Sequence, residues 1–297
     1  MKTINEINNI LVVGAGTLGL RVALRCALDG YKVVMYDIEQ SQLDTAVQMQ
    51  SHLMKSFLSK GMVDEAMVAN VKANLSTSTD LVKASKGCDL VSESIIENID
   101  IKREFYTNLK DHLDEGVILT TNTSYLLPSD LVDCVNQTDH FCALHFHDVF
   151  NQRVVDIMPH PGTAKWVNEV LMEFGRSINQ IPVFIKKENS GYIFNTMLMA
   201  LLGQAGSLAV HDVGSIQDID RSFMGNFGTP IGPFGMMDQV GLDTAHHIVS
   251  VRTDRKSVEF AAFIKAYIDQ GKLGFKTGEG FYKYPNPEYM SQDFLKP

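Results

Sequence analysis

One histidine of this chain has the neighbours that acid–base chemistry needs. His145 ends the apolar run Phe141–His145, which has the composition of a buried strand. Because imidazole exchanges protons near neutral pH, His145 could accept a proton from a substrate hydroxyl. Asp156, eleven residues further on in a second strand-like run, could bond the other ring nitrogen and orient the ring. A buried structural histidine explains the same pattern equally well.

A glycine-rich turn near the N-terminus has the spacing of a dinucleotide-binding loop. The apolar run Ile10–Val13 is followed by Gly14, Gly16 and Gly19, and a helical pattern continues after them. Such glycines permit a tight turn, approach of the backbone to a pyrophosphate, and close packing of the helix. Asp37 ends the next strand-like run, where a carboxylate binds ribose hydroxyls and repels a 2′-phosphate. The pattern predicts NAD, and an ordinary turn without a ligand is the alternative.

Strand-like and helix-like runs alternate through about the first 185 residues, and only helical patterns follow. Such alternation is typical of a mostly parallel sheet with helices on both faces. We therefore predict an α/β fold: a Rossmann-type doubly wound domain at residues 1–187, then a smaller all-α domain at residues 188–297. The helices of the second domain are expected at Tyr192–His211, Ile216–Phe223, Phe234–Val251 and Val258–Gln270.

Polar residues follow the predicted strands where ligands bind in this class of fold, beyond the carboxyl ends of the strands. These candidates are Asp37, Ser92 with Glu93, Asn122 with Ser124, and His145. Polar residues are common wherever a chain turns, but four such positions beside a glycine loop indicate one shared crevice.

His147 follows His145 by two residues and would share its face on a continuing strand. With Asp148 it gives a His-x-His-Asp pattern that is compatible with a metal. We expect no metal, because no third and fourth ligands recur at a recognisable spacing.

The overall composition limits the possible partners. A formal charge of −9 argues against non-specific nucleic-acid binding, which needs a basic face. The four cysteines lack metal or redox spacing, so we expect buried free thiols in a reducing compartment. The first strand begins too early for a signal peptide, and no run is apolar enough to span a membrane. A cytoplasmic protein acting on a small molecule is the expectation.

Two further polar residues have both a functional and a structural interpretation. Asn195 lies in the first turns of a long apolar helix, where its amide could bind a substrate oxygen or a partner helix. Lys60 lies on the exposed side of the helix after Asp37 and could meet substrate phosphates, although a solvated lysine is the more common explanation.

The order of several short motifs resembles the L-3-hydroxyacyl-CoA dehydrogenase family over nearly the whole chain. The motifs are Gly14–Gly19, Glu93–Asn98, Thr121–Ser124, Leu144–Phe146, Gly191–Asn195, Pro230–Gly235, Asp238–Asp243 and Lys272–Tyr282. Several of them are far more specific than a glycine loop.

The resemblance implies NAD-dependent oxidation of a secondary alcohol, with His145 as the catalytic base and Asp156 as its orienting partner. Ser124 and Asn195 would bind the reacting oxygen or the substrate carbonyl, and Lys60 falls near a position that contacts acyl-CoA phosphates. The cofactor contacts that it implies are Gly14, Gly16, Thr17, Leu18, Gly19, Asp37, Glu97, Lys102 and Asn122. It also implies a homodimer formed through the C-terminal helices.

The chain departs from the family pattern just after His145. The family usually reads His-Phe-Phe-Asn-Pro and carries Glu twelve residues after the histidine. Here His147, Asp148 and Val149 follow Phe146, and the acid is Asp156, one residue earlier and one methylene shorter. The strand register must compensate if the two side chains are to meet.

These departures keep three hypotheses open. The first is a dehydrogenase of (S)-3-hydroxyacyl-CoA. The second is an NAD-dependent dehydrogenase of a non-CoA β-hydroxy acid, similar to carnitine or gulonate, and it is motivated by the altered loop. The third is a non-catalytic NAD-binding protein similar to a lens crystallin, motivated by the displaced acid.

Overall fold

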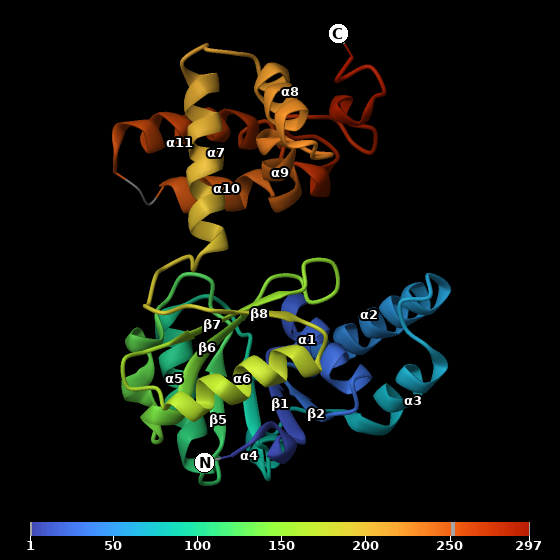
Figure 1. The fold of residues 1–297 in the computed structure, drawn as a ribbon, viewed down its shortest axis with the longest axis vertical. Helices are drawn as coiled ribbons and strands as arrows, with labels where there is room; N and C mark the ends of the chain where they lie inside the picture. Colours follow the sequence, from blue (N-terminus) through green and yellow to red (C-terminus); the bar gives the residue numbers. More distant parts are fainter. Residues whose placement is uncertain (1, 251–252, 297) are drawn as a thin grey trace. The chain divides into compact units, whose positions relative to one another are not determined.

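The computed structural model describes residues 2–250 and 253–296, which divide into two compact units, Met1–Ile193 and Phe194–Pro297. The first unit is built on one eight-stranded sheet with the strand order β3-β2-β1-β4-β5-β6-β7-β8 (Figure 1). All neighbouring strands are parallel except β6 and β7, which are antiparallel. The strands are β1 (Asn9–Val13), β2 (Lys32–Tyr36), β3 (Leu75–Ser78), β4 (Leu90–Glu93), β5 (Ile118–Thr121), β6 (Phe141–Phe146), β7 (Val154–Pro159) and β8 (Ile181–Phe184).

Helices cover both faces of this sheet, so its central strands are buried on both sides. One apolar core packs α1, α2, α3 and α6 on one face, and a second packs α4 and α5 on the other. The six helices are α1 (Thr17–Leu28), α2 (Gln40–Ser59), α3 (Glu65–Asn74), α4 (Leu81–Ser85), α5 (Ile99–Leu109) and α6 (Lys165–Ser177). This is the predicted Rossmann-type doubly wound architecture.

The second unit is helical and has its own apolar core, formed around Leu202, Phe234 and Phe260. Its helices are α7 (Phe194–Val210), α8 (Ile216–Phe227), α9 (Pro233–Val240), α10 (Leu242–Ser250) and α11 (Arg255–Ile268). The prediction of a smaller all-α C-terminal domain is confirmed. Among the described helices, none has the length and apolar character that crossing a bilayer requires.

The boundary between the units lies six residues beyond the predicted one. Residues 188–193 stay with the sheet because their side chains bond the loop after β5. Glu188 accepts hydrogen bonds from the backbone and hydroxyl of Ser129, and Ser190 Oγ donates to the carbonyl of Tyr125 at 2.7 Å. The hydroxyl of Tyr192 donates to the carbonyl of Thr123 at 2.8 Å. Composition alone does not reveal these contacts.

Two local predictions differ from the structure. The single helix expected at Phe234–Val251 is instead two helices, α9 and α10, and Val251 lies outside the described residues. The break is at Gly241, whose φ of 100° is incompatible with a continuing helix. The edge strand β3 has no counterpart in the sequence analysis, because its half-exposed residues Leu75–Ser78 lack an apolar run.

Candidate active site

The antiparallel pair of β6 and β7 places His145 directly opposite Asp156. The two residues are 3% and 1% exposed, and His145 Nδ1 lies 3.1 Å from Asp156 Oδ2. Residues directly opposite on antiparallel strands bring their side chains together, so this register offsets the shorter loop and the shorter acid. On the other side of the ring, Ser124 Oγ lies 3.2 Å from His145 Nε2.

The hydrogen bonds indicate the tautomer of His145. Burial by itself raises the pKa of Asp156, but the bonds from His145 and His147 outweigh it, and the net pKa lies below the ordinary value. The carboxylate is therefore ionised at neutral pH and only accepts, so His145 Nδ1 carries the hydrogen. The lone pair of Nε2 then faces Ser124, whose hydroxyl donates to it. This arrangement suits a base whose reactive nitrogen is Nε2.

Burial also sets the protonation of His145. Loss of water lowers the pKa of the imidazole below its ordinary value, and the hydrogen bond to Asp156 opposes this effect. The neutral ring therefore persists to lower pH than that of an exposed histidine. A neutral imidazole can accept a proton.

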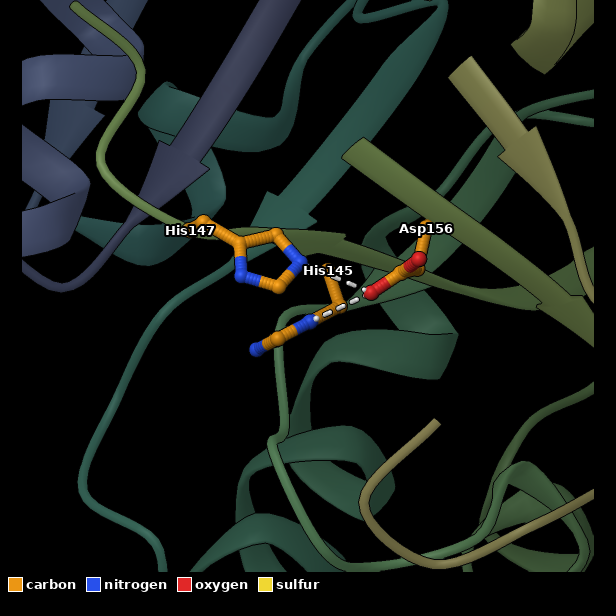
Figure 2. Close-up of side chains that lie close together, drawn as sticks. All are labelled: His145, His147 and Asp156. Carbon is orange, nitrogen blue, oxygen red and sulfur yellow. Dashed lines mark hydrogen bonds and ion pairs between the residues drawn. The ribbon is translucent and has the colours of Figure 1, made fainter. Parts of the chain in front are cut away.

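His147 contacts the same carboxylate oxygen, as Figure 2 shows. Its Nε2 lies 2.9 Å from Asp156 Oδ2, so that one oxygen accepts hydrogen bonds from two imidazoles. Together the three residues could each offer one ligand atom to a metal, all within 4.8 Å of one another. The sequence suggested Asp148 as the acidic member of such a group, whereas the structure supplies Asp156.

Asp148 instead stabilises the loop after β6. Its Oδ2 accepts a hydrogen bond from Arg21 of α1 at 2.7 Å, and its Oδ1 accepts from the backbone amides of Phe150 and Asn151. Val149 between them has a φ of 75°, a strained value for a β-branched residue. The loop that departs from the family pattern is thus tied to the helix of the glycine turn.

Tyr192 packs its ring on His145, a contact that sequence reasoning missed. The two rings are stacked with centroids 4.5 Å apart and planes at 15°, and Tyr192 is 1% exposed. Its bond to the carbonyl of Thr123 holds the ring in place. The residue stands in the family motif Gly191–Asn195, which was the available signal, but no local pattern tells that this ring covers the histidine.

The glycine turn has the geometry of a dinucleotide cradle. A Cβ at Gly19 would lie 1.9 Å from the carbonyl oxygen of Gly14, whereas nothing lies within 4 Å of a Cβ at Gly16. The helix thus packs closely at Gly19, and Gly16 leaves space for a ligand, as a pyrophosphate requires. Thr17 and Leu18 begin α1, so its N-terminus faces this space.

Asp37 lies beside this turn, at the end of β2. One of its oxygens accepts a hydrogen bond from the amide of Ala15 at 2.8 Å, and the other accepts from the amide of Glu39. A cavity of about 690 Å³ opens here, lined by Gly14, Gly16 and Asp37 among others. The residues present therefore fit the adenosine half of NAD.

The remaining predicted cofactor residues surround the ends of β4 and β5. Asn122 donates to Ser94 Oγ and accepts from the amide of Phe146, which joins β5 to the neighbouring strand ends. Glu97 accepts from the Thr123 hydroxyl and from the amides of Ser124 and Tyr125, and thereby fixes the loop that carries Ser124.

Lys102 lies deeper than the resemblance suggested. It is fully buried, with Nζ 2.5 Å from Glu93 Oε1 and 3.8 Å from Glu97 Oε2. Glu93, a strand-end candidate, also accepts from the hydroxyls of Tyr106 and Thr121 and belongs to this buried network. A contact of Lys102 with the cofactor stays a prediction.

The two remaining predicted residues lie on other elements. Lys60 is exposed at the end of α2. Asn195 belongs to the helical unit, in the first turn of α7. Their roles toward substrate stay predictions.

Comparison with known proteins assigns both parts of the chain to one family. Residues 9–189 match the family model of the 3-hydroxyacyl-CoA dehydrogenase NAD-binding domain, and residues 191–284 match that of the 3-hydroxyacyl-CoA dehydrogenase C-terminal domain. A probable 3-hydroxyacyl-CoA dehydrogenase of Caenorhabditis elegans is 31% identical over 291 residues, with 95% of this chain and 94% of the relative covered.

Two solved structures are similar over almost the full length. A diketoreductase described as a catalyst acting on dicarbonyl compounds is 38% identical, with a TM-score of 0.89, covering 96% of this chain and 100% of the other. The (S)-3-hydroxybutyryl-CoA dehydrogenase of Ralstonia eutropha is 26% identical, with a TM-score of 0.85 and coverages of 94% and 100%.

Proposed function

The chain belongs to the 3-hydroxyacyl-CoA dehydrogenase family, and we propose that it interconverts (S)-3-hydroxyacyl-CoA and 3-oxoacyl-CoA with His145 as the general acid–base. It is an NAD-dependent oxidoreductase of that family type. The observation that supports the proposal is the hydrogen bond between His145 Nδ1 and Asp156, because it leaves the lone pair on Nε2, the nitrogen that would exchange the proton.

In the direction of alcohol oxidation, His145 Nε2 takes the hydroxyl proton of the substrate. The glycine turn and Asp37 would hold NAD, which would supply the hydride acceptor when bound. The imidazolium that forms is stabilised by the ionised Asp156, which keeps the ring in one orientation. Ser124 lies within reach of the same nitrogen and holds the reacting oxygen. In the reverse direction His145 returns the proton to the developing alkoxide.

Reduction of acetoacetyl-CoA by NADH, followed as loss of absorbance, tests the proposal. We expect turnover by the wild type and a loss of about 10²–10⁴-fold in His145→Gln, as for removal of a general acid–base. Equal turnover by the two proteins would reject His145 as the base.

The same assay with substrates that lack CoA separates the first two hypotheses. The panel is acetoacetate and a small dicarbonyl compound, the latter chosen because the similar diketoreductase is described as acting on that class. We expect acetoacetyl-CoA to have the highest kcat/KM. A higher kcat/KM for the substrates without CoA would favour the non-CoA alternative. The family assignment by itself does not favour that alternative.

We further propose that the enzyme acts in the cytoplasm in fatty acid metabolism.

We also propose that the helical unit forms a homodimer, as the resemblance implies. A groove of about 710 Å³ between α7 and α8 has a largely apolar lining that includes Leu201, Val213 and Phe227, and the last two are 69% and 72% exposed. Exposed apolar grooves of this kind are typical of protein interfaces. Sedimentation of the wild type as a dimer and of Phe227→Glu as a monomer would support the assignment, and a monomeric wild type would reject it.

A further inference from the structure

We propose that His147 is a positioning residue of the active site: it binds the same oxygen of the Asp156 carboxylate as His145 and thereby limits how strongly that carboxylate supports the catalytic imidazole. This inference rests on the proposed function of His145. It concerns a residue to which the family pattern assigns no role, since the family usually has Phe at this position.

The first support is geometric. His145 Nδ1 and His147 Nε2 lie 3.1 Å and 2.9 Å from the same oxygen, Asp156 Oδ2. The two rings meet edge to face with centroids 4.8 Å apart; His145 lies in β6 and His147 directly follows that strand (Figure 2). One oxygen of the aspartate is thus held between two donors.

The second support is electrostatic. A carboxylate oxygen that accepts two hydrogen bonds offers less negative charge to each donor, so it stabilises an imidazolium at His145 less. The charged and titratable groups that face His145 are Asp156, His147, Glu97 and the phenol of Tyr192. Asp156 and Glu97 raise the pKa of His145, whereas burial and His147 lower it. Tyr192 covers one face of the ring.

The consequence differs between the two directions of the reaction. A weaker base at His145 stays neutral, and therefore able to accept the alcohol proton, at lower pH. Its protonated form is in turn a stronger acid for donating to the alkoxide formed by ketone reduction. We expect His147 to extend alcohol oxidation toward acidic pH and to favour proton donation during reduction.

The test uses His147→Phe, which introduces the usual family residue, and His147→Gln, which keeps a side-chain N–H donor. The control is His52→Phe, because His52 is exposed on α2 and bonds only its own helix, at the carbonyl of Gln48. Two readouts are needed: the titration midpoint of His145 by NMR of histidine-labelled protein, and the pH profile of kcat/KM for alcohol oxidation. The His145→Gln spectrum assigns the resonance.

In His147→Phe we expect the NMR midpoint of His145 to rise by about 0.5 to 1 pH unit, the equivalent of one shared hydrogen bond. The acidic limb of the kcat/KM profile for alcohol oxidation should move upward with it. His147→Gln should restore both toward the wild type, and the control should match the wild type.

An unchanged or lower midpoint in His147→Phe would overturn the inference, and so would a midpoint in His147→Gln equal to that in His147→Phe. The NMR readout does not depend on turnover. If the midpoint shifts as expected but His145→Gln keeps full activity, the proposed function fails while the coupling of the two histidines stands. If His145→Gln is inactive but the midpoint does not move, only the inference fails.

Discussion

Asp156 in the sheet unit and Asp238 in the helical unit are both buried carboxylates, each about 1% exposed, yet their surroundings differ in one decisive way. Asp156 accepts its hydrogen bonds from two imidazoles. Asp238 accepts from the backbone amides of Phe281 and Tyr282 and from the hydroxyl of Tyr284. One set of donors can take up a proton and become charged, and the other set cannot.

The pKa values of the two acids shift in opposite directions. Burial raises the pKa in both cases, but at Asp156 the bonds from the histidines outweigh burial and the pKa is lowered. At Asp238 burial prevails over the amide bonds and the pKa is raised. A buried acid beside imidazoles stays ionised and can stabilise an imidazolium, whereas one beside amides and a phenol is a structural anchor.

The anchor at Asp238 also explains the glycines of the C-terminal motif. A Cβ at Gly280 would lie 2.0 Å from Asp238 Oδ1, and one at Gly274 would lie 2.3 Å from the carbonyl oxygen of Asp238. Gly274 also has a φ of 97°. The chain after α11 can pack against α9 only because Gly274 and Gly280 have no side chains there. These glycines of the motif therefore serve folding.

The largest expected difference between the two acids is catalytic. Asp156→Asn should lower kcat/KM by about 10²–10⁴-fold, because the neutral amide no longer stabilises the imidazolium of His145. Its folded state, followed by fluorescence of the single tryptophan, Trp166 on α6, should persist. If the activity of Asp156→Asn is within tenfold of that of the wild type, the catalytic role that separates Asp156 from Asp238 is wrong.

Asp238→Ala should instead act on stability. It leaves the buried amides of Phe281 and Tyr282 without an acceptor and removes one partner of the half-buried Tyr284 hydroxyl, so the free energy of unfolding of the helical unit should fall by about 3–5 kcal/mol. Hydrogen exchange of residues 194–296 measures this loss, with Asp269→Ala on the exposed end of α11 as the control. Unchanged protection in Asp238→Ala would contradict the anchoring role.

A smaller effect is expected from Gly280→Ala, because the added methyl meets Asp238 and the loop must shift. We expect a loss of about 1–3 kcal/mol in the free energy of unfolding. Gly225→Ala is the matched control: it lies inside α8 with nothing within 4 Å of an added Cβ, so it should gain about 0.5–1 kcal/mol. The idea fails if both glycines respond alike in urea denaturation.

The smallest expected effect is the pH dependence of stability, and its sign differs between the two acids. The lowered pKa of Asp156 gives stability that is present above the ordinary value of 3.8 and is lost as the pH falls through the folded value. The raised pKa of Asp238 gives a contribution that grows as the pH falls through the folded value and is complete below the ordinary value of 3.8. The measurement is the free energy of unfolding of each variant and of the wild type between pH 7 and 3. Asp156→Asn should lose less stability than the wild type on acidification, and Asp238→Asn should lose more. The same sign in both variants would contradict the comparison.

Much of the fold could be predicted from local patterns. The glycine turn, the alternation of strands and helices and the later change to helices identified both domains, and the helix expected after Asp37 is α2, Gln40–Ser59. The prediction of one helix at Phe234–Val251 was wrong because a single glycine can leave the helical region without changing the apolar periodicity. All four cysteines are free and buried, as expected.

By itself the sequence determined which residue types are available and the strand ends at which they stand, because periodicity and turn residues act over a few positions. Only the tertiary structure decided which of them meet. The register of β6 on β7 brings Asp156 to His145 and His147, and the bond from Tyr192 to Thr123 brings a ring onto the imidazole. Folding likewise made Asp238 an anchor. A carboxylate's role depends on donors distant in sequence, and local patterns carry no information about that pairing.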